Sequence, residues 1–295
     1  MITKRLGLLI IALMVLSVAA CADSRMEKTL TLAPGGEFAL RSDTGSVTVT
    51  GSSASGAKIV ITSNRDDLQS LFNFDFTSSD GLAQVTVRKK FFQWFSGVKL
   101  HFDVTVPSLT RVSIQTGGGS IQVSSLQGEQ DLHTSGGSIG ASDVRGRVVA
   151  RTSGGSINLS EVTGNADVGT SGGSITVNSL NGSLQANTSG GPIRIQGITG
   201  RAVAHTSGGS IRVGFAPGNN QGGDLETSGG SIRVSIDPTS NLDIDASTSG
   251  GSVSTDLPLR VQGKISRSSL HGTLGSGGQA LRLHTSGGSI HLSPN

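Results

Sequence analysis

The sequence predicts an all-β fold: a single-chain β-solenoid of about nine coils of 18–21 residues with an N-terminal β-rich cap. The phrase Thr-Ser-Gly-Gly-Ser-Ile occurs intact from Thr134, Thr152, Thr170, Thr206, Thr227 and Thr285, and slightly altered from Thr116, Thr188 and Thr248. Between Thr116 and Thr206 it returns every 18 residues. Apolar and polar residues alternate between the copies, as in half-buried strands. A short, fixed period built from strands indicates coils stacked along one axis.

Residues 1–21 form a predicted signal peptide. Lys4 and Arg5 precede an apolar run of 15 residues that ends at Ala20, which is short for a membrane span. The only cysteine, Cys21, follows Val-Ala-Ala and resembles the lipobox of bacterial lipoproteins, which implies lipidation of Cys21. Ala22 after it, rather than Asp, favours the outer membrane by the same resemblance. The alternative is ordinary cleavage after Ala22, which gives a periplasmic or secreted protein.

Residues 27–115 are predicted to form the N-terminal cap and the first coils. Alternating segments such as 46–50 and 98–106 read as strands. Eight of the nine Phe and the single Trp fall between Phe38 and Phe102, so this region supplies the bulky core that the repeats lack. A stacked array needs such an atypical end segment to cover its apolar end. The cluster from Lys89 to Phe95 is interpreted as cap core, with contact to a membrane surface as the alternative.

Residues 116–295 are the predicted repeat region. Eighteen residues at about 3.3 Å each give a perimeter of about 60 Å, enough for two or three short strands per coil. Residues at equal offsets then stack at about 4.8 Å. The Thr column is expected to face inward or lie on a corner, where its hydroxyls bond those above and below. The last gap of 37 residues contains a degenerate copy, 268–274, and is expected to hold an additional coil.

Composition and motifs exclude several function classes. Without the leader, 21 basic residues face 20 acidic ones, which argues against a nucleic-acid binder. The Gly-Gly pairs lack the Lys and the following helix of a phosphate loop. They also lack the repeated Asp of a calcium-binding repeat. The column His133, Arg151, Asn187, His205 and His284 is too interrupted for a metal site. No cofactor, metal ion or catalytic residue is therefore predicted.

One outward column indicates a ligand. The residue after the strand Ile is Gln122, Gly140, Asn158, Thr176, Arg194, Arg212 and Arg233 in successive coils. Arg194, Arg212 and Arg233 should stack on one face and are the candidate ligand-binding residues, suited to lipopolysaccharide phosphate or an acidic glycan. The alternative is a solvated face whose charge is offset by Glu226 and Asp237.

Catalysis is the competing hypothesis. Asp224, Glu226, Asp237, Asp243, Asp245 and Asp256 gather in the irregular coils, and two suitably spaced carboxylates can hydrolyse a glycosidic bond. The repeats lack long substrate loops and aromatic platforms for sugar rings. The sequence therefore favours a non-enzymatic protein. A polysaccharide lyase or glycosidase is one alternative, and a structural envelope scaffold is another.

A family resemblance supports the predicted fold. Val104-Thr-Val-Pro107, then 112–123 and the Gly-Ser-Ile coils, resemble a bacterial family of adhesin-like domains of unknown function, over about residues 28–292. The resemblance implies an exported or surface β-solenoid whose partner is an envelope or surface macromolecule. It offers no catalytic residues. Attachment to the membrane would come from the lipid on Cys21.

Overall fold

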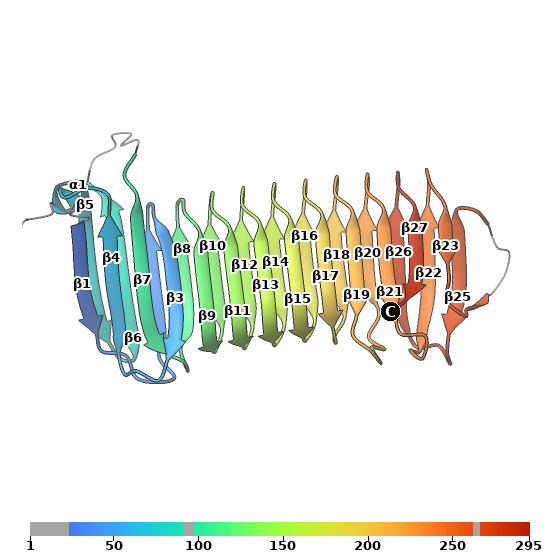
Figure 1. Ribbon diagram of the computed structural model, residues 1–295, viewed down its shortest axis with the longest axis horizontal. Helices are drawn as coiled ribbons and strands as arrows, with labels where there is room; N and C mark the ends of the chain where they lie inside the picture. Colours follow the sequence, from blue (N-terminus) through green and yellow to red (C-terminus); the bar gives the residue numbers. More distant parts are fainter. Residues whose placement is uncertain (1–23, 91–96, 262–265) are drawn as a thin grey trace, which may run out of the picture.

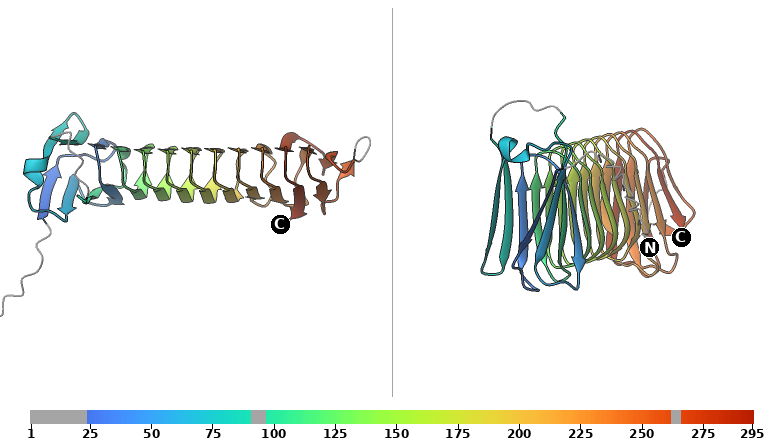
Figure 2. Two further views of the ribbon diagram at one scale, coloured as in Figure 1. Left: turned by 90° about the horizontal axis from the view of Figure 1, so that it is seen from above. Right: turned by 60° about the vertical axis from the view of Figure 1, so that its left-hand side comes forward.

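The computed structural model describes residues 24–90, 97–261 and 266–295, and in them the chain forms a long rod of two facing β-sheets (Figure 1). Figure 2 shows the two sheets running along the whole rod. The only helix in the described ranges is the single turn α1 (Leu68–Leu71). The predicted β-solenoid is confirmed, with two strands per coil, one in each sheet. The leader, Cys21 and most of the Lys89–Phe95 cluster lie outside the described residues.

Within each sheet, the order of the strands in space differs from their order in the chain. In spatial order, the 13-stranded sheet contains β1 (Ser24–Leu30), β4 (Ala57–Ser63), β7 (Leu100–Pro107), β3 (Ser46–Ser52), β9 (Ile121–Gln127), β11 (Ile139–Arg145), β13 (Ile157–Thr163), β15 (Ile175–Asn181), β17 (Ile193–Ile198), β19 (Ile211–Phe215), β21 (Ile232–Ile236), β27 (Ile290–Pro294) and β23 (Val253–Thr255). The 14-stranded sheet contains β24 (Arg260–Val261), β25 (Ser269–Leu274), β22 (Leu242–Thr248), β26 (Gln279–Thr285), β20 (Gly223–Thr227), β18 (Ala202–Thr206), β16 (Leu184–Thr188), β14 (Ala166–Thr170), β12 (Val148–Thr152), β10 (Gln130–Thr134), β8 (Arg111–Thr116), β2 (Glu37–Ser42), β6 (Leu82–Lys89) and β5 (Phe72–Ser79).

The described residues form eleven coils, because eleven strands of each sheet pair in parallel once β1, β4, β5, β24 and β25 are set aside. Nine of the coils carry the Thr phrase. The other two, β2–β3 and β6–β7, come from the N-terminal region. The segment 42–47 is a copy of the phrase that the sequence analysis missed: Ser42 pairs with Thr116, and Val47 pairs with Ile121.

The interior is packed by residues at equal offsets. In a typical coil, the side chains of Val148, Ala150, Ile157, Leu159 and Val162 are all buried. Each pairs in register with its counterpart 18 residues later, so that columns of Val, Ile, Leu and Ala run through the rod. The alternation of apolar and polar residues therefore sets which side chains fill the core and which form outward columns.

The Thr column lies inward at a corner, as expected, but its hydroxyls do not bond one another. Thr170 Oγ1 donates to the carbonyl of Gly155 in the neighbouring coil at 2.8 Å, and it accepts from the Gly173 amide of its own coil at 3.3 Å. The same pair of bonds recurs at Thr134, Thr152, Thr188, Thr206, Thr227, Thr248 and Thr285. Each hydroxyl bonds to glycine backbone and not to the next Thr, so the expected hydroxyl ladder is replaced by a Thr–Gly ladder.

In the regular 18-residue coils, only the second glycine of each pair is needed for close approach. A Cβ on Gly173 would lie 2.0 Å from the carbonyl oxygen of Gly155 in the next coil. A Cβ on Gly172 would meet nothing closer than 3.7 Å. Coils can therefore stack at strand spacing only because the second position has no side chain.

Spatial order departs from sequence order at both ends of the rod. At the N-terminal end, β6–β7 lies outside β2–β3, and β1, β4 and β5 cover it with antiparallel pairing. At the C-terminal end, β26–β27 is inserted between β20–β21 and β22–β23. At each end, the first or last coil of the chain therefore lies next to the body of the rod, and another coil and the cap lie outside it.

The interpretation of 268–274 as an extra coil is wrong. This segment forms β25, which runs antiparallel to β22 and carries β24 on its other edge. Within the 37-residue gap the chain crosses the open end of the rod and returns, so these residues form a cap instead of a coil. The side chains of Leu257 and Leu270 are buried in this cap.

The N-terminal aromatic residues do form cap core. Phe38, Phe72 and Phe102 are buried, while Phe74 and Phe76 stack with ring centroids 6.5 Å apart. These large side chains fill the end of the rod where the narrow repeat interior stops.

A first prediction concerns the two glycines. Gly173→Ala should destabilise the protein by about 3 kcal/mol or more, because its methyl group overlaps a backbone carbonyl that cannot move aside. Gly172→Ala, the matched control, should change stability by about 0.5 kcal/mol or less, since its methyl group enters open space. Denaturant midpoints of the two variants measure this. Equal midpoints would contradict the role given to the second glycine.

A second prediction concerns the Thr hydroxyl. Thr170→Val keeps the volume but removes a buried donor and acceptor, and should cost about 1–3 kcal/mol. Thr170→Ser keeps the hydroxyl and loses one methyl, worth about 0.8 kcal/mol. Urea unfolding should therefore rank Val below Ser. A Val variant as stable as the parent chain would show that the Thr–Gly ladder contributes nothing to stability.

Candidate ligand-binding surfaces

The predicted arginine column exists on the outer face of the 13-stranded sheet. Arg194 on β17 pairs with Arg212 on β19, which pairs with Arg233 on β21. All three side chains are exposed. In the described part of the chain, none of the three guanidinium groups lies within 4.0 Å of a carboxylate. We call these three residues the arginine ladder.

Apart from His291 and Asp256 at one end, the residues beside the arginine ladder are uncharged and mostly small. Thr176 precedes it in the same column. The parallel column two residues further along each strand is Asn178, Gln196, Gly214 and Ser235. His291 follows Arg233 and lies 3.4 Å from Asp256. A charged ligand would therefore meet three cations on a flat polar strip.

Glu226 and Asp237 do not neutralise the ladder. Glu226 is on β20 in the opposite sheet, where its carboxylate lies 3.4 Å from His205. Asp237 follows β21 and accepts hydrogen bonds from the backbone amides of Thr239 and Gly218. The expected offset of the arginine charge is therefore not provided by these two residues.

The carboxylates proposed for catalysis are spread over both sheets. Asp224 on β20 and Asp245 on β22 are separated by β26, with Arg282 paired to both. Asp245 also contacts His271 at 3.1 Å. Asp243 accepts hydrogen bonds from Thr273 and from the amide of Gly278, while Asp256 lies on the other sheet beside His291.

Asp237 is held as a carboxylate. Hydrogen bonds from the backbone and hydroxyl of Thr239, followed by that from the Gly218 amide, lower the pKa of Asp237 below its usual value. A general acid needs a raised pKa. Asp237 is therefore suited to holding its turn and poorly suited to protonating a leaving group.

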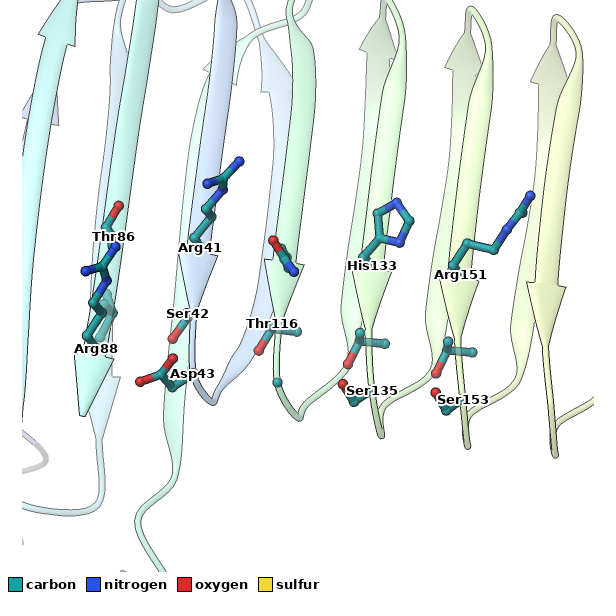
Figure 3. Close-up of a pocket in the computed structure, with 15 residues that line it drawn as sticks. Arg41, Ser42, Asp43, Thr86, Arg88, Thr116, His133, Ser135, Arg151 and Ser153 are labelled. Carbon is teal, nitrogen blue, oxygen red and sulfur yellow. The ribbon is translucent and has the colours of Figure 1, made fainter. Parts of the chain in front are cut away.

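A second surface, which the sequence analysis missed, lies on the outer face of the 14-stranded sheet near the N-terminal cap. It is a groove of about 590 Å³ that crosses β6, β2, β8, β10 and β12 (Figure 3). Its polar lining includes Arg41, Arg88, Gln115, His133, Ser135, Arg151 and Ser153. We call it the N-terminal groove.

Register explains why the groove was missed. Arg41 pairs with Gln115, Gln115 with His133, and His133 with Arg151, so these four residues form one column. Only the later members of this column are evident from the sequence period, and they were rejected as a metal site because the column is too interrupted. Aligning the 42–47 copy with the Thr phrase would have placed Arg41 beside Gln115. No sequence period places Arg88 there, because β6 is out of sequence order.

Comparison with known families identifies the fold. The sequence profile of the Toastrack DUF4097 family matches residues 74–293, which is most of the chain. The chain belongs to the Toastrack DUF4097 family. No curated protein matches it.

Two solved structures resemble this Toastrack chain. A candidate lipid-binding protein from Parabacteroides distasonis is 13% identical with a TM-score of 0.51, over 92% of this chain and 96% of that one. A candidate adhesin from Bacteroides fragilis is 14% identical with a TM-score of 0.47, over 93% and 99%. At these identities, the first structure supports the shared fold of the Toastrack chain and nothing more specific.

Two kinds of feature are absent from the described residues. Nowhere in residues 24–90, 97–261 and 266–295 do three or more His, Cys, Asp or Glu side chains group as metal ligands would. Over the same ranges, no helix has both the length and the apolar character needed to cross a bilayer.

Proposed function

We propose that this chain is a non-enzymatic, exported β-solenoid of the cell envelope or surface. In this proposal it acts as an adhesin-like module that binds an anionic macromolecule through Arg194, Arg212 and Arg233. The observation that carries the proposal is the arginine ladder itself: three exposed guanidinium groups on adjacent strands, without an acidic partner among the described residues. Like charges directly opposite each other destabilise a sheet. The alignment of the three arginines therefore lowers the stability of the sheet, and a bound polyanion would offset this loss.

The geometry favours a linear polyanion. Adjacent strands place the three cations about 4.8 Å apart along the rod axis. An acidic glycan or the phosphorylated sugars of lipopolysaccharide could lie along this line and meet several cations at once. The uncharged column beside the ladder leaves room for sugar hydroxyls to form hydrogen bonds with Asn178, Gln196 and Ser235.

The position of the ladder along the rod suits a surface-exposed role. β1 begins at Ser24, three residues after Cys21, so a lipid on Cys21 would attach to the N-terminal end of the rod. The ladder begins six strand spacings beyond the outermost N-terminal coil, or about 30 Å. In an outer-membrane lipoprotein this distance would hold the ladder away from the bilayer. A periplasmic or secreted form would keep the same rod and ladder.

A third prediction tests the ladder. The variant Arg194→Gln/Arg212→Gln/Arg233→Gln should bind lipopolysaccharide or polygalacturonate about 3- to 150-fold more weakly. The reason is that each exposed ion pair contributes about 0.2–1 kcal/mol. Binding by the parent chain should also weaken as salt rises, since the contacts are solvent-exposed. The measurement is retention of the mature chain, residues 22–295, on each immobilised polymer across a salt series.

The matched control is Arg145→Gln/Arg147→Gln/Arg201→Gln, which removes the same charge away from the ladder. Equal loss in both triple variants would reject the ladder as the binding face. No retention by the parent chain would instead favour a structural scaffold. Reducing sugar released in the same wells would favour the polysaccharide-degrading enzyme.

A further inference from the structure

The N-terminal groove places cations and hydroxyls in two parallel rows. Figure 3 shows Arg41, His133 and Arg151 at a similar height on their strands, with Arg88 attached nearer the turns, where Ser135 and Ser153 form a second row. Strand register fixes most of this arrangement, because Arg41 and His133 lie in one column on either side of Gln115. The groove crosses five strands, which is about 19 Å along the rod.

Five polar side chains of the groove have no partner within the described chain. Arg41, Arg88, Gln115, Ser135 and Ser153 make no side-chain hydrogen bond or ion pair there. These five side chains can therefore bind a ligand without breaking an existing contact.

The remaining charged groups of the groove are held in place by neighbours. His133 contacts Asp131 at 2.8 Å, and Arg151 contacts Asp167 at 2.7 Å. Asp43 is the only carboxylate among the lining residues, and it accepts a hydrogen bond from the Lys89 amide at 2.8 Å. Because Asp167 offsets the charge of Arg151, the balance of the lining is Arg41 and Arg88 against Asp43. This leaves an excess of positive charge, so the ligand should be anionic.

The lining also limits the class of anion. Val87 is the only large apolar residue in it, so an acyl chain would find little surface to cover. Its lining holds no Phe, Tyr or Trp, so the bases of a single-stranded nucleic acid would lack the large aromatic platforms on which they usually stack. The volume is that of a small-molecule site, and the hydroxyl and amide groups suit sugar hydroxyls.

We propose that the N-terminal groove binds a short anionic oligosaccharide segment lying across β6, β2, β8, β10 and β12. Arg41 and Arg88 contact its carboxylates or phosphates, and Gln115, Ser135 and Ser153 contact its hydroxyls. The groove is on the sheet opposite the arginine ladder and in the other half of the rod, so it is a second site that does not depend on the ladder. The segment comes either from a soluble polysaccharide or from the headgroup of a glycolipid.

The experiment uses the mature chain and two probes. Short oligogalacturonates report on soluble polysaccharide, and vesicles containing lipopolysaccharide, compared with plain phosphatidylcholine vesicles, report on glycolipid. The test variants are Arg41→Gln/Arg88→Gln, which removes the free cations, and Gln115→Glu, which places a carboxylate between Arg41 and His133. All substituted side chains are on the outer face, and far-ultraviolet circular dichroism with thermal midpoints checks that each variant folds.

The controls separate this site from the arginine ladder. Arg145→Gln/Arg147→Gln removes the same charge at the opposite turn of the neighbouring coils. The triple variant of Arg194, Arg212 and Arg233 removes the ladder. The Arg145→Gln/Arg147→Gln control should bind each probe within about twofold of the parent chain. Because the ladder is itself proposed to bind these polymers, the two groove variants are also measured in the ladder triple variant, and in either background they should weaken binding by more than twofold and up to about 30-fold.

Each outcome decides the proposal. Groove-dependent binding of oligogalacturonate identifies a soluble polysaccharide as the source, and groove-dependent binding of the lipopolysaccharide vesicles alone identifies a glycolipid. Binding that the groove variants and the Arg145/Arg147 control weaken equally overturns the proposal, as does the absence of binding to both probes. Loss in the ladder variant alone would leave the proposed function standing and reject the groove.

Discussion

The buried Thr–Gly ladder is the interaction on which the rest of the structure depends. Each Thr hydroxyl joins a glycine amide of its own coil to a glycine carbonyl of the next, as Thr170 does between Gly173 and Gly155. The bond forms only if the two backbones approach closely, and this requires a second glycine without Cβ. Register is therefore locked at one corner of every repeat. The outward columns inherit that register, so the alignment of Arg194 with Arg212 follows from a contact in the interior.

A rod of stacked coils has two apolar ends, and this chain closes both in the same way. At the N-terminal end, β2–β3 is followed by the cap strands β4 and β5, and β6–β7 then lies between this cap and β2–β3. At the C-terminal end, β22–β23 is followed by the cap strands β24 and β25, and β26–β27 then lies on the inner side of β22–β23. Antiparallel pairing stops the stack because β5 and β25 present no further parallel edge of the repeat type. The same device puts β2 between β6 and β8, which brings Arg41 into the column of Gln115 and His133.

The features that could be predicted from the sequence are those that depend on the 18-residue repeat. The β-solenoid, the inward Thr and the register of the arginine ladder all follow from residues at equal offsets. Features that depend on the spatial order of the strands could not be predicted. The cap role of 268–274 and the position of Arg88 are two of these, because both depend on where the chain leaves the repeat. The backbone conformation at one offset of the coil could not be predicted either, since Asp143, Glu161 and Ser179 adopt positive φ at the position of Gly197.

Both proposed surfaces gain from rigidity more than from the strength of any single contact. An exposed ion pair contributes little, partly because long side chains must be ordered and salt screens the charges. In a solenoid the backbone positions of successive cations are fixed before a ligand binds. The ligand therefore loses its translational and rotational entropy once and gains several contacts for that loss. A polymer whose charges repeat near the strand spacing would use all three arginines of the ladder. One with a very different repeat would reach only one or two of them, so selectivity would arise from spacing rather than from a deep pocket.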